Sequence, residues 1–143
     1  MKIVVDTSVW IDHFRRSNPT LLRLLQTHAV LAHPLILGEL RCGSLPTPRS
    51  KALSTVEGLH HSAAVSIDEV ITLIEEEEIF GRGCGLVDLA LLMSTIKTPG
   101  ARLWAMDKRL AALAKRLGVA HVEPPPHTMH RGEPALTAAS PTA

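Results

Sequence analysis

Short apolar runs alternate with helical patterns along the first 122 residues of the chain. Residues 2–6 form a short, β-branched and unbroken run, which predicts a strand buried on both faces. Similar runs predict further strands, and the segments between them carry the spacing of amphipathic helices. The predicted strands are 2–6, 29–32, 61–65, 102–106 and 119–122, and the predicted helices include 8–16, 34–42 and 107–117. This alternation predicts an α/β fold with a parallel sheet and helices on both faces.

Capping residues predict where several helices begin and end. Thr7-Ser8 is expected to cap the first helix, and Asn18-Pro19 places a cap before a proline at the first helical position. Ser66 with Glu69 three residues later is a capping box, and Gly43 is a stop signal. A loop is expected over 44–50 and another over 81–85, the second followed by an apolar helix.

The last 21 residues differ from the rest. Residues 123–143 hold five of the ten prolines, with Ala, Thr, Ser and Gly, and they offer almost nothing to bury. This composition predicts a disordered or loosely attached tail. The folded domain is therefore expected to span residues 1–122.

Composition narrows the class of protein. A hydrophobic fraction of 45% in 143 residues suffices for one core, and the absence of Tyr makes that core mainly aliphatic. A net charge of +1 gives no strong field for nucleic acid or a membrane surface. Cys42 and Cys84 cannot form a disulfide framework and are expected to be reduced, small apolar residues. No signal peptide or membrane span is predicted, so a cytoplasmic protein without membrane contact is expected.

Four acids interrupt the apolar runs. Asp6 ends the first strand, Glu39 lies within an apolar helix, Asp88 is the only charge between residues 85 and 96, and Asp107 follows a strand. An ionised carboxylate on a buried element is costly unless it is paired or binds a metal. Sites in open α/β sheets form beyond the carboxyl ends of the strands, which is where Asp6 and Asp107 are expected. The four acids are therefore candidates for one catalytic, metal-binding site.

Oxygen ligands of this kind favour hard cations, chiefly Mg²⁺ or Mn²⁺. Two carboxylates about 5 Å apart repel each other by roughly 3 kcal/mol at an effective dielectric near 20, so a cation would stabilise such a cluster. A bound divalent ion suits phosphodiester hydrolysis, because it activates water and stabilises the leaving oxygen. Structural roles remain the alternative: Asp6 and Asp107 as helix caps, Asp88 and Glu39 as partners of basic groups.

The segments around the acids resemble a known family. Val4 to Asp12, Leu37-Gly38-Glu39-Leu40, Gly83 to Asp88 and Leu103 to Leu110 occur in the order found in PIN-domain nucleases, and they are similar to the VapC toxins of bacterial VapBC toxin–antitoxin pairs. The resemblance covers residues 1–122. It implies a three-layer α/β/α fold with a central, mostly parallel sheet, and a Mg²⁺- or Mn²⁺-dependent endoribonuclease. It also implies a homodimer, a VapB-type antitoxin as partner, and contact with DNA only through that antitoxin.

The same resemblance implies roles for individual residues. Asp6 and Asp88 would be the main metal ligands, Glu39 and Asp107 would complete the site through waters or a second ion, and Ser8 would orient Asp6. Ala105 departs from the family, which often has Thr or Ser two residues before the last acid. The basic side chains expected at the rim of the site, as candidates for RNA phosphates, are Arg15, Arg16, Arg41, Arg82, Lys108 and Arg109.

Two other functions fit parts of the pattern. A phosphatase of the haloacid-dehalogenase type also places an Asp nucleophile at a strand end, but it needs a second Asp two residues later, where this chain has Ser8. A catalytically inactive interaction module would not need four acids in apolar surroundings. Neither alternative accounts for the four acids together.

Overall fold

A parallel sheet of three strands lies at the centre of the computed structural model, which describes residues 1–46 and 48–122. The strands are β1 (Lys2–Val5), β2 (Val30–Leu31) and β3 (Ala101–Trp104), in the order β2-β1-β3. Ile3 pairs with Val30 on one side and Arg102 on the other. Because every pairing is parallel, the carboxyl ends of the strands share one edge of the sheet.

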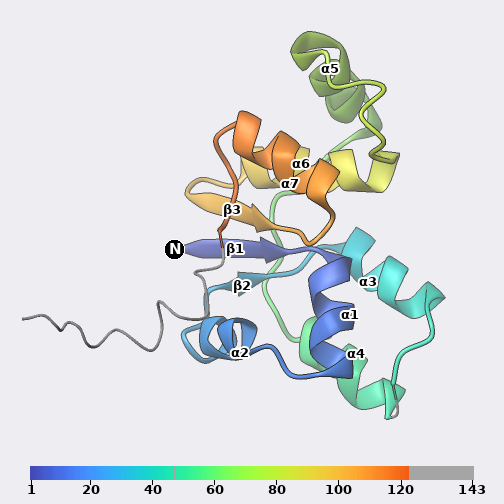
Figure 1. The fold of residues 1–143 in the computed structure, drawn as a ribbon, viewed down its shortest axis with the longest axis vertical. Helices are drawn as coiled ribbons and strands as arrows, with labels where there is room; N and C mark the ends of the chain where they lie inside the picture. Colours follow the sequence, from blue (N-terminus) through green and yellow to red (C-terminus); the bar gives the residue numbers. More distant parts are fainter. Residues whose placement is uncertain (47, 123–143) are drawn as a thin grey trace, which may run out of the picture.

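Helices surround the sheet (Figure 1). In that view α6 and α7 lie beyond β3, and α1, α2 and α4 lie beyond β2. The mixed arrangement of helices around a parallel sheet agrees with the predicted three-layer α/β/α fold. The helices of the described residues are α1 (Thr7–Arg15), α2 (Pro19–Gln26), α3 (Pro34–Cys42), α4 (Arg49–Glu57), α5 (Ile67–Glu77), α6 (Leu86–Lys97) and α7 (Lys108–Arg116).

The helix boundaries follow the capping residues of the sequence in most places. Asn18 caps α2, and Ser66 and Glu69 form the predicted capping box of α5. Gly43 ends α3 as expected. The cap of α1 was predicted wrongly: Asp6, not Thr7-Ser8, holds that position and accepts a hydrogen bond from the backbone N–H of Ser8.

Two predicted strands are reduced to single bridges. Residues 61–65 contribute one bridge, between Ala32 and His61, and residues 119–122 contribute one, between Leu103 and Ala120. Neither segment therefore extends the sheet as a strand of the predicted length. The predicted tail over 123–143 lies outside the described residues, and its separation from a 1–122 domain stays a prediction.

The core is aliphatic, as the composition indicates. The three strands are buried through Ile3, Val4, Val5 and their neighbours. Helix α6 packs on β3, and its Leu91 and Leu92 are fully buried. Burying one such side chain stabilises the fold by about 1.5–3 kcal/mol. This packing fixes the ends of β1 and β3, which Asp6 and Asp107 follow.

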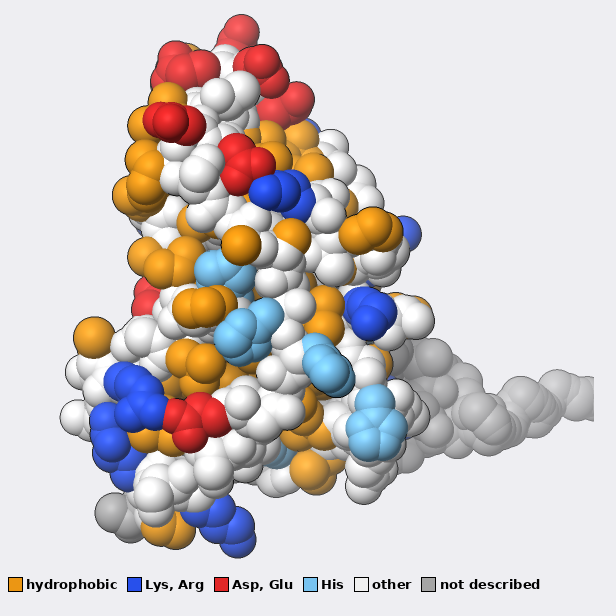
Figure 2. Space-filling view, turned by 180° about the vertical axis from the view of Figure 1, so that it is seen from behind, with side chains coloured by type: hydrophobic (Ala, Val, Ile, Leu, Met, Phe, Trp, Pro, Cys, Tyr) orange, Lys and Arg blue, Asp and Glu red, His pale blue; other side chains and the backbone are white. Residues whose placement is uncertain are grey.

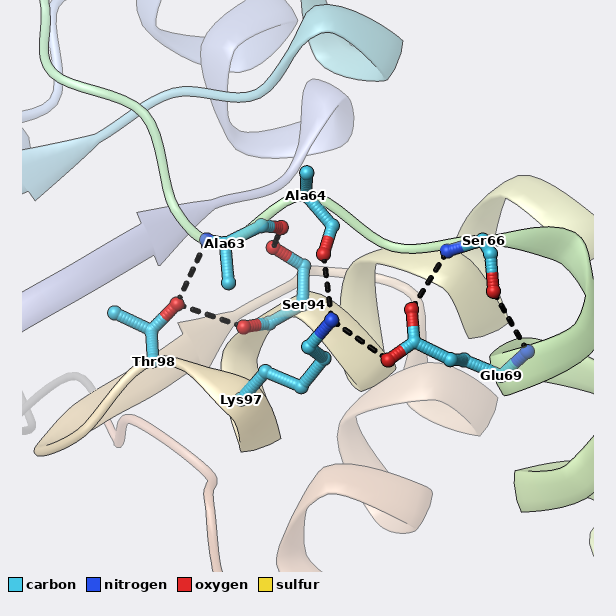
Figure 3. Close-up of polar contacts among 7 residues, drawn as sticks. All are labelled: Ala63, Ala64, Ser66, Glu69, Ser94, Lys97 and Thr98. Atoms are coloured by element: carbon cyan, nitrogen blue, oxygen red, sulfur yellow. Dashed lines mark hydrogen bonds and ion pairs between the residues drawn. The ribbon is translucent and has the colours of Figure 1, made fainter.

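Helix α5 packs on α6 and stands away from the sheet at one end of the molecule (Figure 1). A polar network joins the segment before α5 to α6 (Figure 3). The buried Ser94 hydroxyl donates to the carbonyl oxygen of Ala63 at 2.6 Å, and the Lys97 ammonium donates to Ala64 and pairs with Glu69. The network fixes the direction in which α5 extends from the rest of the domain.

Charge is unevenly distributed over the surface. Figure 2 shows acidic side chains gathered at the α5 end, and Lys and Arg side chains toward the opposite end. The acidic group belongs to α5 and its end, where Asp68 and Glu75 to Glu78 are exposed. Within the described part of the chain, no helix has the length and apolar character needed to cross a membrane.

Candidate active site

All four candidate acids lie in one cleft at the carboxyl edge of the sheet. The cleft has a volume of about 810 Å³. Asp6 follows β1, Glu39 lies on α3, Asp88 lies in the first turn of α6 and Asp107 precedes α7. The other residues that line the cleft are Thr7, Ser8, Ile11, Pro34, Leu35, Gly38, Cys42, Gly43 and Val87. The structure thus brings together residues that are up to 101 positions apart in the sequence.

Asp6 is the most buried of the four, with 5% of its surface exposed. Its Oδ2 atom accepts hydrogen bonds from the hydroxyl of Ser8 at 2.7 Å and from the backbone N–H of Ser8 at 3.3 Å. Its Oδ1 atom is buried and has no hydrogen-bond partner among the described residues. Burial raises the pKa of Asp6, although the bonds from Ser8 lower it, and nearby Asp88 raises it further. One carboxylate oxygen therefore lacks the partner that a buried charge requires.

Ser8 connects two of the strand ends. Its hydroxyl donates to Asp6 and accepts from the backbone N–H of Met106 at 3.2 Å, and Met106 lies in the turn between β3 and α7. The backbone N–H of Asp6 also donates to the carbonyl of Trp104 at 2.9 Å. The predicted contact from Ser8 to Asp6 is therefore confirmed. The Ser8 hydroxyl also lies next to the turn after β3, where Ala105 has no hydroxyl group.

Glu39 is held by a neighbour that the sequence did not single out. The Thr7 hydroxyl donates to Glu39 Oε1 at 2.7 Å, across 32 positions of the sequence. The start of α3 is fixed by His33, whose Nδ1 accepts from the backbone N–H of Leu35 at 3.0 Å. Because Nδ1 acts as an acceptor, His33 is neutral on that nitrogen, and burial lowers its pKa. These two contacts orient the helix and the carboxylate relative to β1.

Asp88 accepts a hydrogen bond from the backbone N–H of Gly85 through Oδ2, at 3.1 Å. An acid in the first turn also interacts favourably with the positive end of the helix dipole. Asp107 caps α7: its Oδ1 accepts from the backbone N–H groups of Arg109 and Leu110, and its Oδ2 accepts from the Arg109 guanidinium. The structural roles considered for Asp6 and Asp107, as helix caps, are thus present beside any catalytic role.

The acids differ in burial more than the sequence suggested. Asp6 is buried, whereas Glu39, Asp88 and Asp107 are partly exposed on the wall of the cleft. Both cysteines are free, as expected; Cys42 is exposed at the cleft and Cys84 is half-buried.

The donor set fits a hard divalent cation held mainly by two carboxylates. Among residues 1–46 and 48–122, no three His, Cys, Asp or Glu side chains are arranged as a ready cluster of ligands. Mg²⁺ does not require one, because it keeps several waters and binds through one or two carboxylates. The unpartnered Oδ1 of Asp6, with Asp88 close enough to raise its pKa, meets that requirement.

The basic residues expected at the rim have different surroundings. Arg41 pairs with Glu57 and Arg16 pairs with Asp12, whereas Lys108 lines a separate hollow beside Trp104. Arg109 donates a hydrogen bond to Asp107, one of the four acids of the cleft. The Thr7–Glu39 and Arg109–Asp107 contacts were missed from the sequence. The sequence held one local indication of the Arg109–Asp107 contact: Arg109 lies two positions after Asp107, at the start of a helix.

The chain is similar to curated ribonucleases over most of its length. No model of a known protein family matches the chain. Two curated relatives, each named Ribonuclease VapC32 and each from a strain of Mycobacterium tuberculosis, are 42% identical to it over 121 residues. The alignment spans 85% of this chain and 97% of each relative. Identity at this level, over nearly the whole length of the relatives, shows that the chain belongs to the VapC family of PIN-domain nucleases.

Proposed function

We propose that this protein is a Mg²⁺- or Mn²⁺-dependent endoribonuclease and the toxin of a toxin–antitoxin pair. The observation that carries the metal site is the buried Asp6 carboxylate, whose Oδ1 lacks a partner among the described residues and faces no basic side chain in the lining of its cleft. The name of the relatives supports an RNA substrate.

The residues of the cleft would have different roles in phosphodiester hydrolysis. Asp6 and Asp88 would hold the ion, and Ser8 keeps the Asp6 carboxylate turned by its hydrogen bond to Oδ2. A bound divalent ion supplies an activated water and neutralises the charge that develops on the leaving oxygen. Glu39, fixed by the Thr7 hydroxyl, can orient the attacking water and receive its proton.

The direct test incubates the purified protein with total RNA, with Mn²⁺ or with EDTA. Cleavage is expected with Mn²⁺ and is expected to disappear in EDTA and in Asp88→Asn. Cleavage that persists in either condition would contradict the metal mechanism. Asp12→Asn is a matched control, because Asp12 pairs with Arg16 on the exposed side of α1 and does not line the cleft.

The phosphatase alternative has less support from the contacts. A haloacid-dehalogenase-type enzyme would need a second carboxylate at position 8, where Ser8 instead donates a hydrogen bond to Asp6. An assay with a small phosphate monoester separates the two activities. Turnover of the monoester without RNA cleavage would favour the phosphatase.

We also propose that the protein forms a homodimer and binds a VapB-type antitoxin. Large apolar side chains are exposed along α5, in the connection to α6 and at the start of α6: Ile67, Ile71, Phe80 and Leu86 are 57%, 48%, 59% and 50% exposed. Apolar surface of this kind is typical of protein interfaces. A single species of twice the chain mass in light scattering would support the dimer, and a monomer would refute it.

The toxin role has its own test. Expression of the protein alone is expected to arrest growth, and co-expression of the product of the neighbouring gene is expected to relieve the arrest. Asp88→Asn is expected to be harmless while it still binds that partner. Growth arrest by Asp88→Asn would separate toxicity from the proposed chemistry.

A further inference from the structure

Asp107 is already neutralised within the chain, unlike Asp6. Its Oδ1 accepts from the backbone N–H groups of Arg109 and Leu110 at 2.9 and 3.2 Å, and its Oδ2 accepts from Arg109 Nη2 at 3.1 Å. The hydrogen bond from the Arg109 side chain is the largest cause that lowers the pKa of Asp107. Both oxygens of this carboxylate therefore already accept hydrogen bonds, whereas Oδ1 of Asp6 accepts none from the described residues.

The Arg109 side chain also lies close to the loop that leads into α6. Gly83 in that loop has a φ of +79°, and a Cβ added to it would lie 2.8 Å from Arg109 Nη1 and 2.9 Å from Cδ. The positive φ favours glycine at this position, and a larger residue would displace the Arg109 side chain. Arg109 also interacts electrostatically with Cys84 and Asp88. The side chain thus lies between Asp107 and the loop, at the rim of the acidic cleft.

An acidic cleft needs positive charge to bind a polyanion. Four carboxylates line the cleft, and a phosphodiester that enters would be repelled unless cations offset them. Guanidinium carries five N–H donors in a planar fork and binds phosphate through two of them. One Nη of Arg109 bonds to Asp107, and 63% of the side chain is exposed to solvent.

We propose that Arg109 binds a phosphate of the RNA substrate at the rim of the cleft, and that Asp107 is the positioning residue that holds Arg109 there rather than a metal ligand. This inference rests on the proposed ribonuclease function, and it differs from the metal role that the family resemblance implies for Asp107. In this arrangement the ion is held by Asp6 and Asp88, and the ion pair at 107 and 109 serves the substrate.

Binding of Mn²⁺ alone, measured by calorimetry without RNA, tests the part assigned to Asp107. Asp107→Asn leaves Arg109 unpaired near the ion and is expected to weaken Mn²⁺ binding by about two- to fivefold, the range of an exposed charge interaction. Arg109→Gln leaves Asp107 unpaired and is expected to strengthen Mn²⁺ binding by about the same factor. The double variant is expected to return to wild-type affinity, because the two charges leave together.

A metal-ligand role for Asp107 predicts a different pattern. The double variant would then bind Mn²⁺ as weakly as a variant that lacks a true ligand, and Asp88→Asn provides that reference, with an expected loss of about tenfold or more. A double variant that matches Asp88→Asn would overturn the proposal. Circular dichroism of each variant checks that the fold is retained.

Binding of a fluorescent single-stranded RNA in EDTA, where cleavage is absent, tests the part assigned to Arg109. Arg109→Gln is expected to weaken binding by about fivefold or more, and to reduce the slope of log affinity against log salt by about 0.7, the contribution of one phosphate contact to a single strand. Arg109→Lys is expected to restore part of the affinity, because it keeps the charge without the planar fork.

Arg102→Gln is the matched control, since it removes the same charge from an exposed arginine that bonds to the Gly118 carbonyl, outside the cleft lining. Its effect on RNA affinity is expected to stay below about twofold. Equal losses in the two variants would overturn the phosphate contact. If wild-type protein cleaves RNA and Arg109→Gln binds it unchanged, this inference alone fails. If wild-type protein neither binds nor cleaves RNA, the proposed function fails as well.

Discussion

Replacing Asp6 by Asn is expected to stabilise the metal-free protein while it removes metal binding. Asp6 is 5% exposed, and the net effect of its surroundings is to raise its pKa, so desolvation outweighs the hydrogen bonds from Ser8. A buried ion without a charged partner costs several kcal/mol. Making the two Ser8 bonds neutral rather than charge-assisted loses about 1 kcal/mol each. The difference is a net gain of about 1–2 kcal/mol, or about 3–10 °C in Tm for a domain of this size.

Thermal unfolding followed by circular dichroism in EDTA and in Mn²⁺ provides the assay. Wild-type protein at a Mn²⁺ concentration of about 100 times Kd is expected to gain about 2.7 kcal/mol, because the ion binds the folded state only. Asp6→Asn is expected to gain far less. A lower Tm for Asp6→Asn in EDTA, or an equal Mn²⁺ shift in both proteins, would refute the view that Asp6 is a strained metal ligand.

The same variant has a defined dependence on pH. The folded-state pKa of Asp6 lies above its ordinary value of 3.8, so the unfolded chain releases this proton first as pH rises. The destabilisation by Asp6 is therefore fully present above its raised pKa and disappears as pH falls toward 3.8. The stability difference between Asp6→Asn and wild type in EDTA is expected to be largest at neutral pH and to shrink with acid. A stability difference that grows as the pH falls would contradict a raised pKa of Asp6.

Three further substitutions test individual hydrogen bonds. Ser8→Ala removes the donor to Asp6 and the acceptor for Met106, and is expected to lower the free energy of unfolding by about 1–2 kcal/mol in urea titration, with cleavage reduced as well; unchanged cleavage would argue against its orienting role. Thr7→Val removes the donor to Glu39 and is expected to lower kcat about tenfold with KM unchanged, as a loss of orientation does; a change in KM alone would count against it. Ser94→Ala leaves the Ala63 carbonyl without this donor and is expected to lower the free energy of unfolding by about 1–3 kcal/mol, measured by denaturant titration, with cleavage unchanged.

The sequence predicted the elements whose signals are local. The strand over 2–6, the caps at Asn18 and Ser66 and the helix over 34–42 all follow from residues within a few positions of each other. The strands predicted over 61–65 and 119–122 failed because strand formation depends on pairing partners far away in the chain. Each segment meets a neighbour at one bridge only, so its composition alone could not define its length.

The candidate acids could be found from the sequence because charge within an apolar run has a visible energetic cost. The hydrogen-bond partners of these acids could not be found in the same way. Thr7 reaches Glu39 across 32 positions, and Ser8 reaches Met106 across 98, so neither contact leaves a local pattern. The degree of burial was also hidden, since a helix that is apolar in composition can still turn one carboxylate toward solvent, as Glu39 and Asp88 do.

The hydroxyl of Ser8 forms a hydrogen-bonded link between the ends of two neighbouring strands. It bonds to Asp6 at the end of β1 and to the backbone of Met106 in the turn after β3. When the Asp6 carboxylate loses its charge or engages an ion, its attraction for this proton changes, and the hydrogen bond that Ser8 accepts from the turn changes with it. Met106 directly precedes Asp107, and the Asp107 side chain accepts a hydrogen bond from Arg109. A single oxygen atom, Ser8 Oγ, therefore links the Asp6 carboxylate to the turn that leads to Asp107.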